Sequence, residues 1–204
     1  MNKNCIVLLF LALFSFACNN ESNQSSSSNS IGRDSSAVSN DMLTKDSNQI
    51  SPDCTNTIMA FLKWYKTNYE IVNPMQDAVV SLKGDSANAI YRVDFDAAEK
   101  YLATLRASGF FSERFLQRTL QYFKGADVNL VKTKQNDGPP EGFEFDFLLL
   151  TQESESLLAH YKSSKTAFIA PNQVKLVLPE NTLFFTVQVQ QGNCIIDSIG
   201  LGTK

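Results

Sequence analysis

The first amphipathic pattern in the chain begins just after residue 52. Apolar side chains recur there at steps of three and four, the spacing that places residues on one face of a helix. The members of this stripe are Ile58, Phe61, Leu62, Tyr65, Tyr69 and Val72. Asp53 has the acceptor side chain of a helix cap, and Pro74 removes a backbone donor. The pattern therefore predicts an opening helix that Asp53 begins and Pro74 ends.

Two more helical patterns follow and are separated by a short turn. Asp94 or Asp96 is expected to cap the first, which ends at Gly109. Ser112 is expected to cap the second, which ends at Gly125. Their apolar faces are Ala98, Tyr101, Leu102 and Leu105, then Phe115, Leu116, Leu120 and Phe123. The two patterns predict a helical hairpin.

The period changes after a Gly- and Pro-rich break at residues 136–142. Phe143, Phe145 and Phe147 alternate with acidic residues, as in a strand, and the apolar run 148–150 fits a strand or a buried helical turn. Later segments are rich in β-branched and aromatic residues and are joined by short turns. They are 166–170, 174–178, 183–189 and 193–199. The short links predict antiparallel pairing.

Helices that precede strands in this way predict an α+β domain over residues 51–204. We expect about three N-terminal helices packed on one face of a curved antiparallel sheet of about four strands. The length of this segment is typical of one domain.

The residues before this domain predict export. Lys3 precedes an apolar run from Ile6 to Phe16, which is shorter than the roughly 20 residues of a membrane span. Small residues stand just before Cys18, so residues 1–17 are interpreted as a lipoprotein signal peptide. Cleavage would leave Cys18 at the amino terminus to carry a diacylglyceryl group and an acyl chain such as palmitate. An ordinary cleaved secretory signal is the alternative.

Residues 18–50 contain the lipid-attachment cysteine followed by a Ser- and Asn-rich stretch. Such a composition cannot bury enough apolar surface to offset the entropy of ordering, so we expect a disordered tether. A lipid-anchored protein of this kind would lie in the bacterial cell envelope, at the outer membrane, facing the periplasm or the cell surface. The sequence leaves the leaflet and the oligomeric state open.

Export also bears on the cysteines. Cys5 leaves with the signal peptide, so Cys54 and Cys194 are the two that remain in the domain. An oxidising compartment permits a disulfide between them, and two buried free thiols are the alternative. His160 is the only histidine in the chain, so this pair lacks the ligands of a closed zinc site. No metal and no other cofactor is predicted.

Three short segments carry a resemblance to a known family. They are Phe-Leu-Lys-Trp-Tyr at 61–65, the segment 145–153, and Ile-Ile-Asp-Ser-Ile at 195–199. Together they resemble an uncharacterised domain of bacterial lipoproteins, which is similar in fold to the nuclear-transport-factor-2-like class. The resemblance implies a cone-like domain with a pocket between the helices and the sheet. It implies no particular reaction.

Two residues are candidates for catalysis. Asp146 lies among phenylalanines, and burial of such a carboxyl group raises its pKa and suits a general base, as in cone-shaped isomerases. A strand would instead place Asp146 and Glu144 on the solvated face, which is the preferred interpretation. His160 is flanked by Leu157 and Leu158 and is interpreted as a structural or surface histidine.

Five residues are candidates for ligand binding. Trp64, Tyr65 and Tyr69 offer rings with polar tips, although aromatic residues at helical spacing usually belong to a core. Gln152 and Glu153 are polar residues within a segment that carries the resemblance.

Charge is unevenly distributed although the net charge is only −3. Bases dominate residues 100–134, and acids without any base occupy residues 137–155. The two blocks are expected to pair with each other or with solvent, and steering of a charged partner is the alternative. The overall balance gives no attraction to nucleic acid.

These observations predict a membrane-anchored envelope lipoprotein whose domain binds a small ligand or an envelope protein without catalysis. The motifs of serine hydrolases and zinc proteases are absent from the sequence. An acid–base enzyme of the cone-shaped isomerase class that uses Asp146 is the alternative. A further alternative is an envelope inhibitor or immunity protein that acts through the basic helices, with Arg114 and Arg118 in contact.

Overall fold

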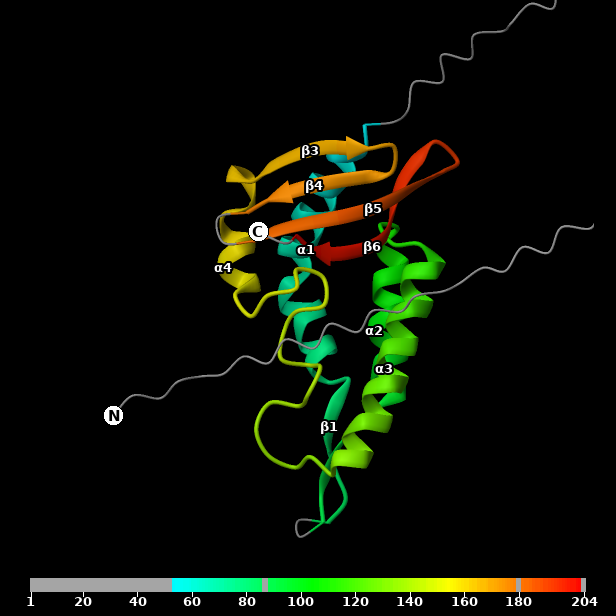
Figure 1. Cartoon of the computed structure of the whole chain (residues 1–204), viewed down its shortest axis with the longest axis vertical. Helices are drawn as coiled ribbons and strands as arrows, with labels where there is room; N and C mark the ends of the chain where they lie inside the picture. Colours follow the sequence, from blue (N-terminus) through cyan, green and yellow to red (C-terminus); the bar gives the residue numbers. More distant parts are fainter. Residues whose placement is uncertain (1–52, 86–87, 179–180, 203–204) are drawn as a thin grey trace, which may run out of the picture. The chain divides into compact units, whose positions relative to one another are not determined.

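The computed structural model describes residues 53–85, 88–178 and 181–202, which all belong to one compact unit, Asn48–Lys204 (Figure 1). The described residues are α+β, as predicted, and form four α-helices, a four-stranded antiparallel sheet and a two-stranded sheet. The predictions for the signal peptide, Cys18 and the linker lie outside the described residues.

Helix α1 (Cys54–Asp77) begins where the sequence predicts, since the side chain of Asp53 accepts a hydrogen bond from the backbone of Thr55 at 3.0 Å. The prediction that Pro74 ends the helix is wrong. The helix continues for three residues because Val72 and Gln76 are both buried and hold the last turns in place. The side chains of Gln76 and Asp77 therefore belong to α1.

Helices α2 (Phe95–Ser108) and α3 (Glu113–Thr133) form the predicted helical pair. Asp94, rather than Asp96, caps α2, and Gly109 ends it with a left-handed φ of 75°. Ser112 caps α3 through the backbone of Phe115 at 3.0 Å. The predicted end of α3 at Gly125 is wrong, because the helix continues for two further turns.

The extension of α3 packs against a hairpin that was not predicted. Strands β1 (Val80–Lys83) and β2 (Ile90–Val93) form this small antiparallel sheet. Asp127 of α3 accepts hydrogen bonds from the Nε atom of Arg92 at 2.8 Å and from the backbone of Val93 at 3.0 Å. These contacts, together with buried Leu130, continue the helix past its glycine.

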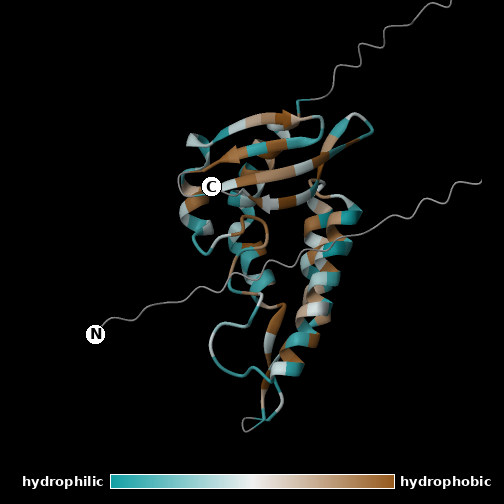
Figure 2. Cartoon of the chain, in the orientation of Figure 1, coloured by the Kyte–Doolittle hydropathy of each residue, from teal (hydrophilic) through white to brown (hydrophobic). Residues whose placement is uncertain are grey.

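The main sheet is a meander in the order β3-β4-β5-β6, which confirms the predicted antiparallel pairing. Its strands are β3 (Lys165–Ala170), β4 (Gln173–Val177), β5 (Thr182–Gln190) and β6 (Asn193–Leu201). Buried and half-buried residues alternate along the first part of β5, as expected for a sheet with one buried face. Figure 2 shows apolar and polar residues interspersed along these strands.

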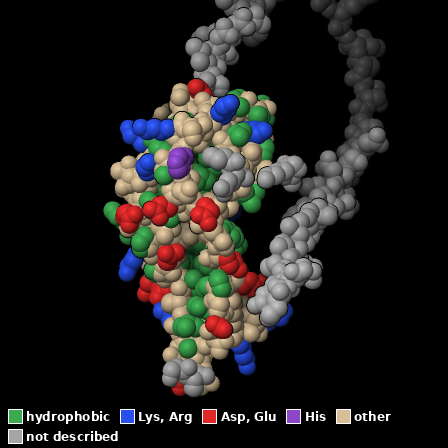
Figure 3. All heavy atoms as spheres, turned by 90° about the vertical axis from the view of Figure 1, so that its left-hand side faces the viewer, with side chains coloured by type: hydrophobic (Ala, Val, Ile, Leu, Met, Phe, Trp, Pro, Cys, Tyr) green, Lys and Arg blue, Asp and Glu red, His purple; other side chains and the backbone are tan. Residues whose placement is uncertain are grey.

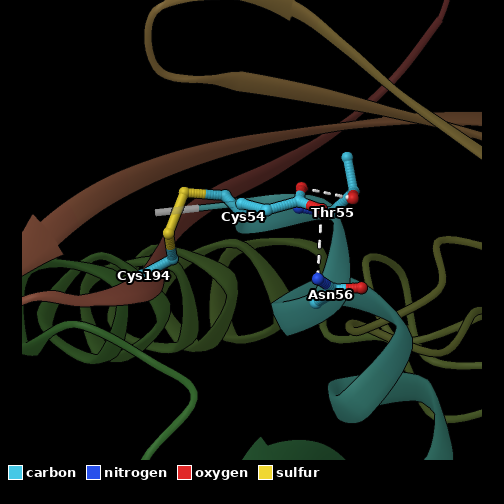
Figure 4. The surroundings of a disulfide bond; sticks show 5 residues. Cys54, Thr55, Asn56 and Cys194 are labelled. Carbon is cyan, nitrogen blue, oxygen red and sulfur yellow. Dashed lines mark hydrogen bonds between the residues drawn. A yellow bond between two sulfur atoms is a disulfide. The ribbon is translucent and has the colours of Figure 1, made fainter. Parts of the chain in front are cut away.

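The core lies between α1 and this sheet. Phe61 of α1 is fully buried, and its ring meets those of Phe111 and Phe185 edge-on at centroid distances of 5.5 and 6.0 Å. At one end of the core Cys54 and Cys194 form a disulfide, with 5.4 Å between their Cα atoms (Figure 4). The bond closes a separation of 140 residues, which in chain-entropy models stabilises the fold by about 5 kcal/mol.

The connection between α3 and the main sheet differs from the sequence prediction. Residues 143–153 form turns rather than the strand expected from the alternation of phenylalanines and acids. The connection then continues with helix α4 (Ser154–Ala159) and the 3-10 helix η1 (Tyr161–Ser163). Among the described residues, no helix combines the length and the apolar character needed to cross a membrane.

Candidate functional site

Asp146 organises the turns that lie beside α1. Its Oδ1 atom accepts hydrogen bonds from the backbone N–H groups of Leu148 and Leu149 at 2.8 and 2.9 Å. Its own backbone pairs with Leu150 at 2.7 Å and with Thr151 at 3.0 Å. Leu150 has a φ of 51°, a left-handed conformation that is unfavourable for a residue with a Cβ atom. The hydrogen bonds of Asp146 hold this conformation in place.

The prediction that Asp146 faces solvent is wrong, because the segment is not a strand and its alternation does not separate two faces. Asp146 is only 4% exposed. Its Oδ2 atom accepts a hydrogen bond from the hydroxyl group of Tyr65, which lies on α1. Asp146 therefore joins α1 to the turns through a buried contact between segments far apart in the sequence.

The ionisation of this cluster is set mainly by burial. Burial raises the pKa of Asp146, and the hydrogen bonds from Tyr65, Leu148 and Leu149 only partly oppose this effect. Burial and the charge of Asp146 raise the pKa of Tyr65, so its hydroxyl group remains a donor. The hydroxyl group of Tyr101 is also buried, and it has no hydrogen-bond partner among the described residues.

A polar cleft of about 290 Å³ lies between the end of α1 and residues 143–154. Most of its polar lining comes from amide and carboxyl side chains. These are Asn73, Gln76, Asp77, Glu144, Asp146 and Gln152. Tyr69 and Phe145 supply aromatic surface beside them.

Gln76 fixes the two walls of the polar cleft relative to each other. Its amide nitrogen donates to the backbone carbonyl of Phe145 at 3.2 Å, and its amide oxygen accepts from the backbone of Phe147 at 2.9 Å. The hydroxyl groups of Tyr69 and Ser154 make a second link across the cleft at 2.7 Å. The walls are thus held by side-chain contacts from both elements, which suits a preformed site.

The lining of the polar cleft contains carboxyl groups but no lysine or arginine. Partial burial raises the pKa of one of them, Asp77. Figure 3 shows acidic side chains gathered across the middle of the face that is on the left-hand side of Figure 1. The cleft therefore offers mainly hydrogen-bond acceptors and negative charge to a ligand.

The structure separates the candidate residues into three groups. Tyr69, Asp146 and Gln152 line the polar cleft, and Tyr65 supports Asp146 from the core. Trp64 does not line the cleft but packs against Phe110, with ring centroids 5.8 Å apart.

Glu153 and His160 line a second, smaller cleft of about 120 Å³. His160 is exposed, and its Nδ1 atom lies 2.9 Å from the backbone oxygen of Ser156, which makes that nitrogen the donor. Thr151 lines both clefts. His160 and Asp146 therefore belong to different sites and do not form an acid–base pair.

Sequence analysis missed Asn73, Gln76 and Asp77. Their spacing of three and four residues places them on one side of a helix, which is the available signal. The expectation that the helix ended at Pro74 concealed it. Ser154 was missed because its position depends on the end of the turn region and the start of α4.

No group of three or more His, Cys, Asp or Glu residues within 53–85, 88–178 and 181–202 is arranged to hold a metal ion. Comparison of the chain with protein-family models, curated proteins and solved structures finds no match. The site is therefore interpreted from its geometry.

Proposed function

We propose that the chain is a membrane-anchored lipoprotein of the bacterial cell envelope whose domain binds a small ligand in the polar cleft without transforming it. The signal-like residues 1–17 and Cys18 support the anchor. The cone-like fold, with three helices packed on a curved sheet, is part of the same proposal. The observation that carries the binding function is a polar cleft of about 290 Å³ whose walls are fixed by Gln76 and Tyr69.

The lining indicates the class of ligand. Carboxyl and amide oxygens accept hydrogen bonds, and acids without a neighbouring base favour positive charge. The aromatic surface of Tyr69 and Phe145 suits the apolar face of a compact molecule. A small amine or amino sugar, rich in N–H and O–H donors, combines these features.

The hydrogen bonds of Asp146 support binding rather than catalysis. Its Oδ1 atom already accepts from two backbone N–H groups, and its Oδ2 atom accepts from Tyr65. A general base needs a free lone pair directed at the substrate. In Asp146 most of the acceptor capacity is used to hold the turns.

Calorimetric titration of the mature protein with a panel of amines, polyols and amino sugars tests the proposal. We expect a saturable complex with a cationic member of the panel. Gln152→Ala removes a polar contact and Asp77→Asn removes a negative charge, so each should weaken the complex by about three- to tenfold. Glu153→Ala is the matched control, since this exposed neighbour lines the other cleft. Unchanged affinity in both cleft variants would exclude the polar cleft as the site.

Mass spectrometry tests the anchor separately. The mature protein should begin at Cys18 and carry acyl chains, and Cys18→Ser should abolish acylation. A mature chain that begins elsewhere, or that carries no lipid, would contradict the anchor without bearing on the cleft.

An acid–base enzyme is the second candidate, because Asp146 is buried beside the cleft and burial raises its pKa. Such an enzyme would exchange a carbon-bound proton of its ligand with solvent. Proton exchange in deuterated water, followed by NMR, should then occur with the wild type and fail with Asp146→Asn. Absence of exchange in a ligand that binds would support the noncatalytic function.

The inhibitor or immunity hypothesis has less support. Arg114 donates two hydrogen bonds to buried Asp197, so this base has a partner inside the fold, whereas Arg118 forms only a longer ion pair with Asp197 at 3.7 Å.

A further inference from the structure

A third cleft lies on the other side of residues 145–150 and is lined mainly by apolar side chains. It has a volume of about 290 Å³ and lies between α3, the turns and β6. Its apolar walls are Phe115, Tyr122, Phe145, Phe147, Leu150 and Ile199. We call it the apolar cleft. Phe145 separates it from the polar cleft, since its side chain lines both.

The walls of the apolar cleft are held from outside it. The hydroxyl group of Tyr122 donates to the backbone oxygen of Gly142 at 2.7 Å, which fixes the ring from α3 against the turns. Phe147 meets the ring of Tyr122 edge-on at 5.6 Å. Leu150 is held in its left-handed conformation by the backbone hydrogen bond to Asp146. The cleft is therefore a shaped apolar surface.

Three charged side chains meet at one rim of the apolar cleft, where Arg118 and Asp197 line the cleft and Arg114 pairs with Asp197. Asp197 is only 2% exposed and accepts hydrogen bonds from Arg114, through Nε at 2.9 Å and through Nη2, and from Ser112 at 2.8 Å. Arg118 lies farther away, with its Nη1 atom 3.7 Å from the Oδ2 atom of Asp197. Asp197 thus pairs with two guanidinium groups, of which only that of Arg118 lines the cleft.

The N–H donors of Arg118 are available to a ligand. Its side chain is 59% exposed and makes no hydrogen bond within the part of the chain that the structure describes. A guanidinium group presents five N–H donors in a planar fork that matches a carboxylate. Because the hydrogen bonds of Asp197 come from Arg114 and Ser112, a carboxylate beside Arg118 would gain attraction without breaking them, although it would share Arg118 with the longer ion pair to Asp197.

We propose that the apolar cleft binds an amphiphilic carboxylate, with its hydrocarbon chain against the phenylalanines and its head group on Arg118. Apolar walls alone would bind any hydrophobic ligand of suitable size. The exposed guanidinium group of Arg118 favours an anionic head group and disfavours a cationic one. This site is distinct from the polar cleft, whose lining favours the opposite charge.

Titration of the mature protein with decanoate tests this proposal. We expect saturable binding at one site and a weakening of about five- to tenfold in Arg118→Gln, since the arginine contact is charge-assisted but partly exposed. Arg106→Gln is the matched control, because Arg106 is an exposed arginine paired with Glu113 and does not line the cleft. Its affinity should equal that of the wild type.

Two further measurements separate head-group recognition from simple partition. Decyltrimethylammonium has the same chain with a positive head and should not bind measurably. The NMR signal of the labelled carboxyl carbon of decanoate reports the titration of the carboxyl group. The pKa of this group should be lowered in the complex with the wild type and normal in the complex with Arg118→Gln. Equal binding of the cationic probe, equal affinity in Arg118→Gln, or no binding of decanoate would each overturn the proposal.

Discussion

Asp146 and Asp197 are two buried carboxyl groups with opposite surroundings. Each joins segments that are more than eighty positions apart, Asp146 to Tyr65 and Asp197 to Arg114. Asp146 receives neutral donors, and burial raises its pKa. The hydrogen bond from Arg114 is the largest influence on Asp197 and lowers its pKa. The comparison shows that burial dominates the pKa of a buried acid whose donors are neutral, as at Asp146, and that a charged partner outweighs burial at Asp197.

The two acids also differ in what they hold. Asp197 is on strand β6, at the register shift where Ser198 pairs with Thr186 and Ile196 with Val187, and Ser112, which donates to Asp197, also caps α3. These elements have hydrogen-bonded backbones of their own. Asp146 holds irregular turns, in which Leu150 is in an unfavourable conformation. The walls of both clefts depend on those turns, so Asp146 has the larger structural role.

Replacement of each acid by alanine should give the largest losses of stability, and the loss should be greater for Asp146 than for Asp197. Asp146→Ala leaves the hydroxyl group of Tyr65 and two backbone N–H groups buried without an acceptor, which should lower the free energy of unfolding by about 3–4 kcal/mol. Asp197→Ala should cost about 2 kcal/mol, because Arg114 is 58% exposed and can return to water. Urea unfolding of both variants measures the difference. A larger loss in Asp197→Ala would reverse the comparison.

Removal of the hydroxyl group of Tyr65 should give the next largest loss in the free energy of unfolding. Tyr65→Phe keeps the buried ring but removes the donor to Asp146, so the acid loses one of the hydrogen bonds that oppose its burial. A hydrogen bond to a charged group contributes about 1.5–3 kcal/mol, and we expect a loss in that range. When Asp146 has already been replaced by Asn, Tyr65→Phe should lower the free energy of unfolding by less, because the acceptor is no longer charged. Equal costs in the two backgrounds would show that Tyr65 and Asp146 act independently.

Much of the fold could be predicted because it depends on local patterns. The caps Asp53 and Ser112 and the four later strands follow from residue type and spacing. Pro74 and Gly125 were wrongly expected to end helices, because packing on both sides of each residue overrides local propensity. The hairpin of β1 and β2 was missed because its four-residue strands are too short for a clear period.

The candidate site could be predicted only in part. From the sequence, a solvated Asp146 was the preferred interpretation and a buried general base the alternative, because its burial depends on Tyr65 and on turns that no local pattern identifies. Tyr69 and Gln152 were named without any indication that they share a cleft. The disulfide between Cys54 and Cys194 was an open alternative, since a distance between distant residues is not visible in the sequence.

The pH dependence of stability should differ in sign for the two acids. The pKa of Asp146 is raised on folding, so between its unfolded and folded values the native state holds more protons and stability falls as pH rises. The pKa of Asp197 is lowered, so its contribution is present above the unfolded pKa and is lost as pH falls through the folded one. The unfolded values are near 3.9.

Urea unfolding between about pH 2.5 and 7 measures this difference. Asp146→Asn should remove a loss of stability that occurs above about pH 4, whereas Asp197→Asn should remove a loss that occurs below it. Each variant is compared with the wild type, so the titration of other acids cancels. Curves that change on the same side of this pH in both variants would contradict the assigned directions.

Tyr101 gives the smallest and most specific test. Its hydroxyl group is buried near the same acid as that of Tyr65, yet it has no hydrogen-bond partner among the described residues. Removal of an unpaired buried polar group relieves its desolvation cost, so Tyr101→Phe should raise the free energy of unfolding by up to about 1 kcal/mol. Tyr65→Phe is the matched control, since it makes the same chemical change with the opposite expected sign. A loss of stability in Tyr101→Phe similar to that in Tyr65→Phe would mean that both hydroxyl groups support Asp146, and the contrast between paired and unpaired donors in this cluster would fail.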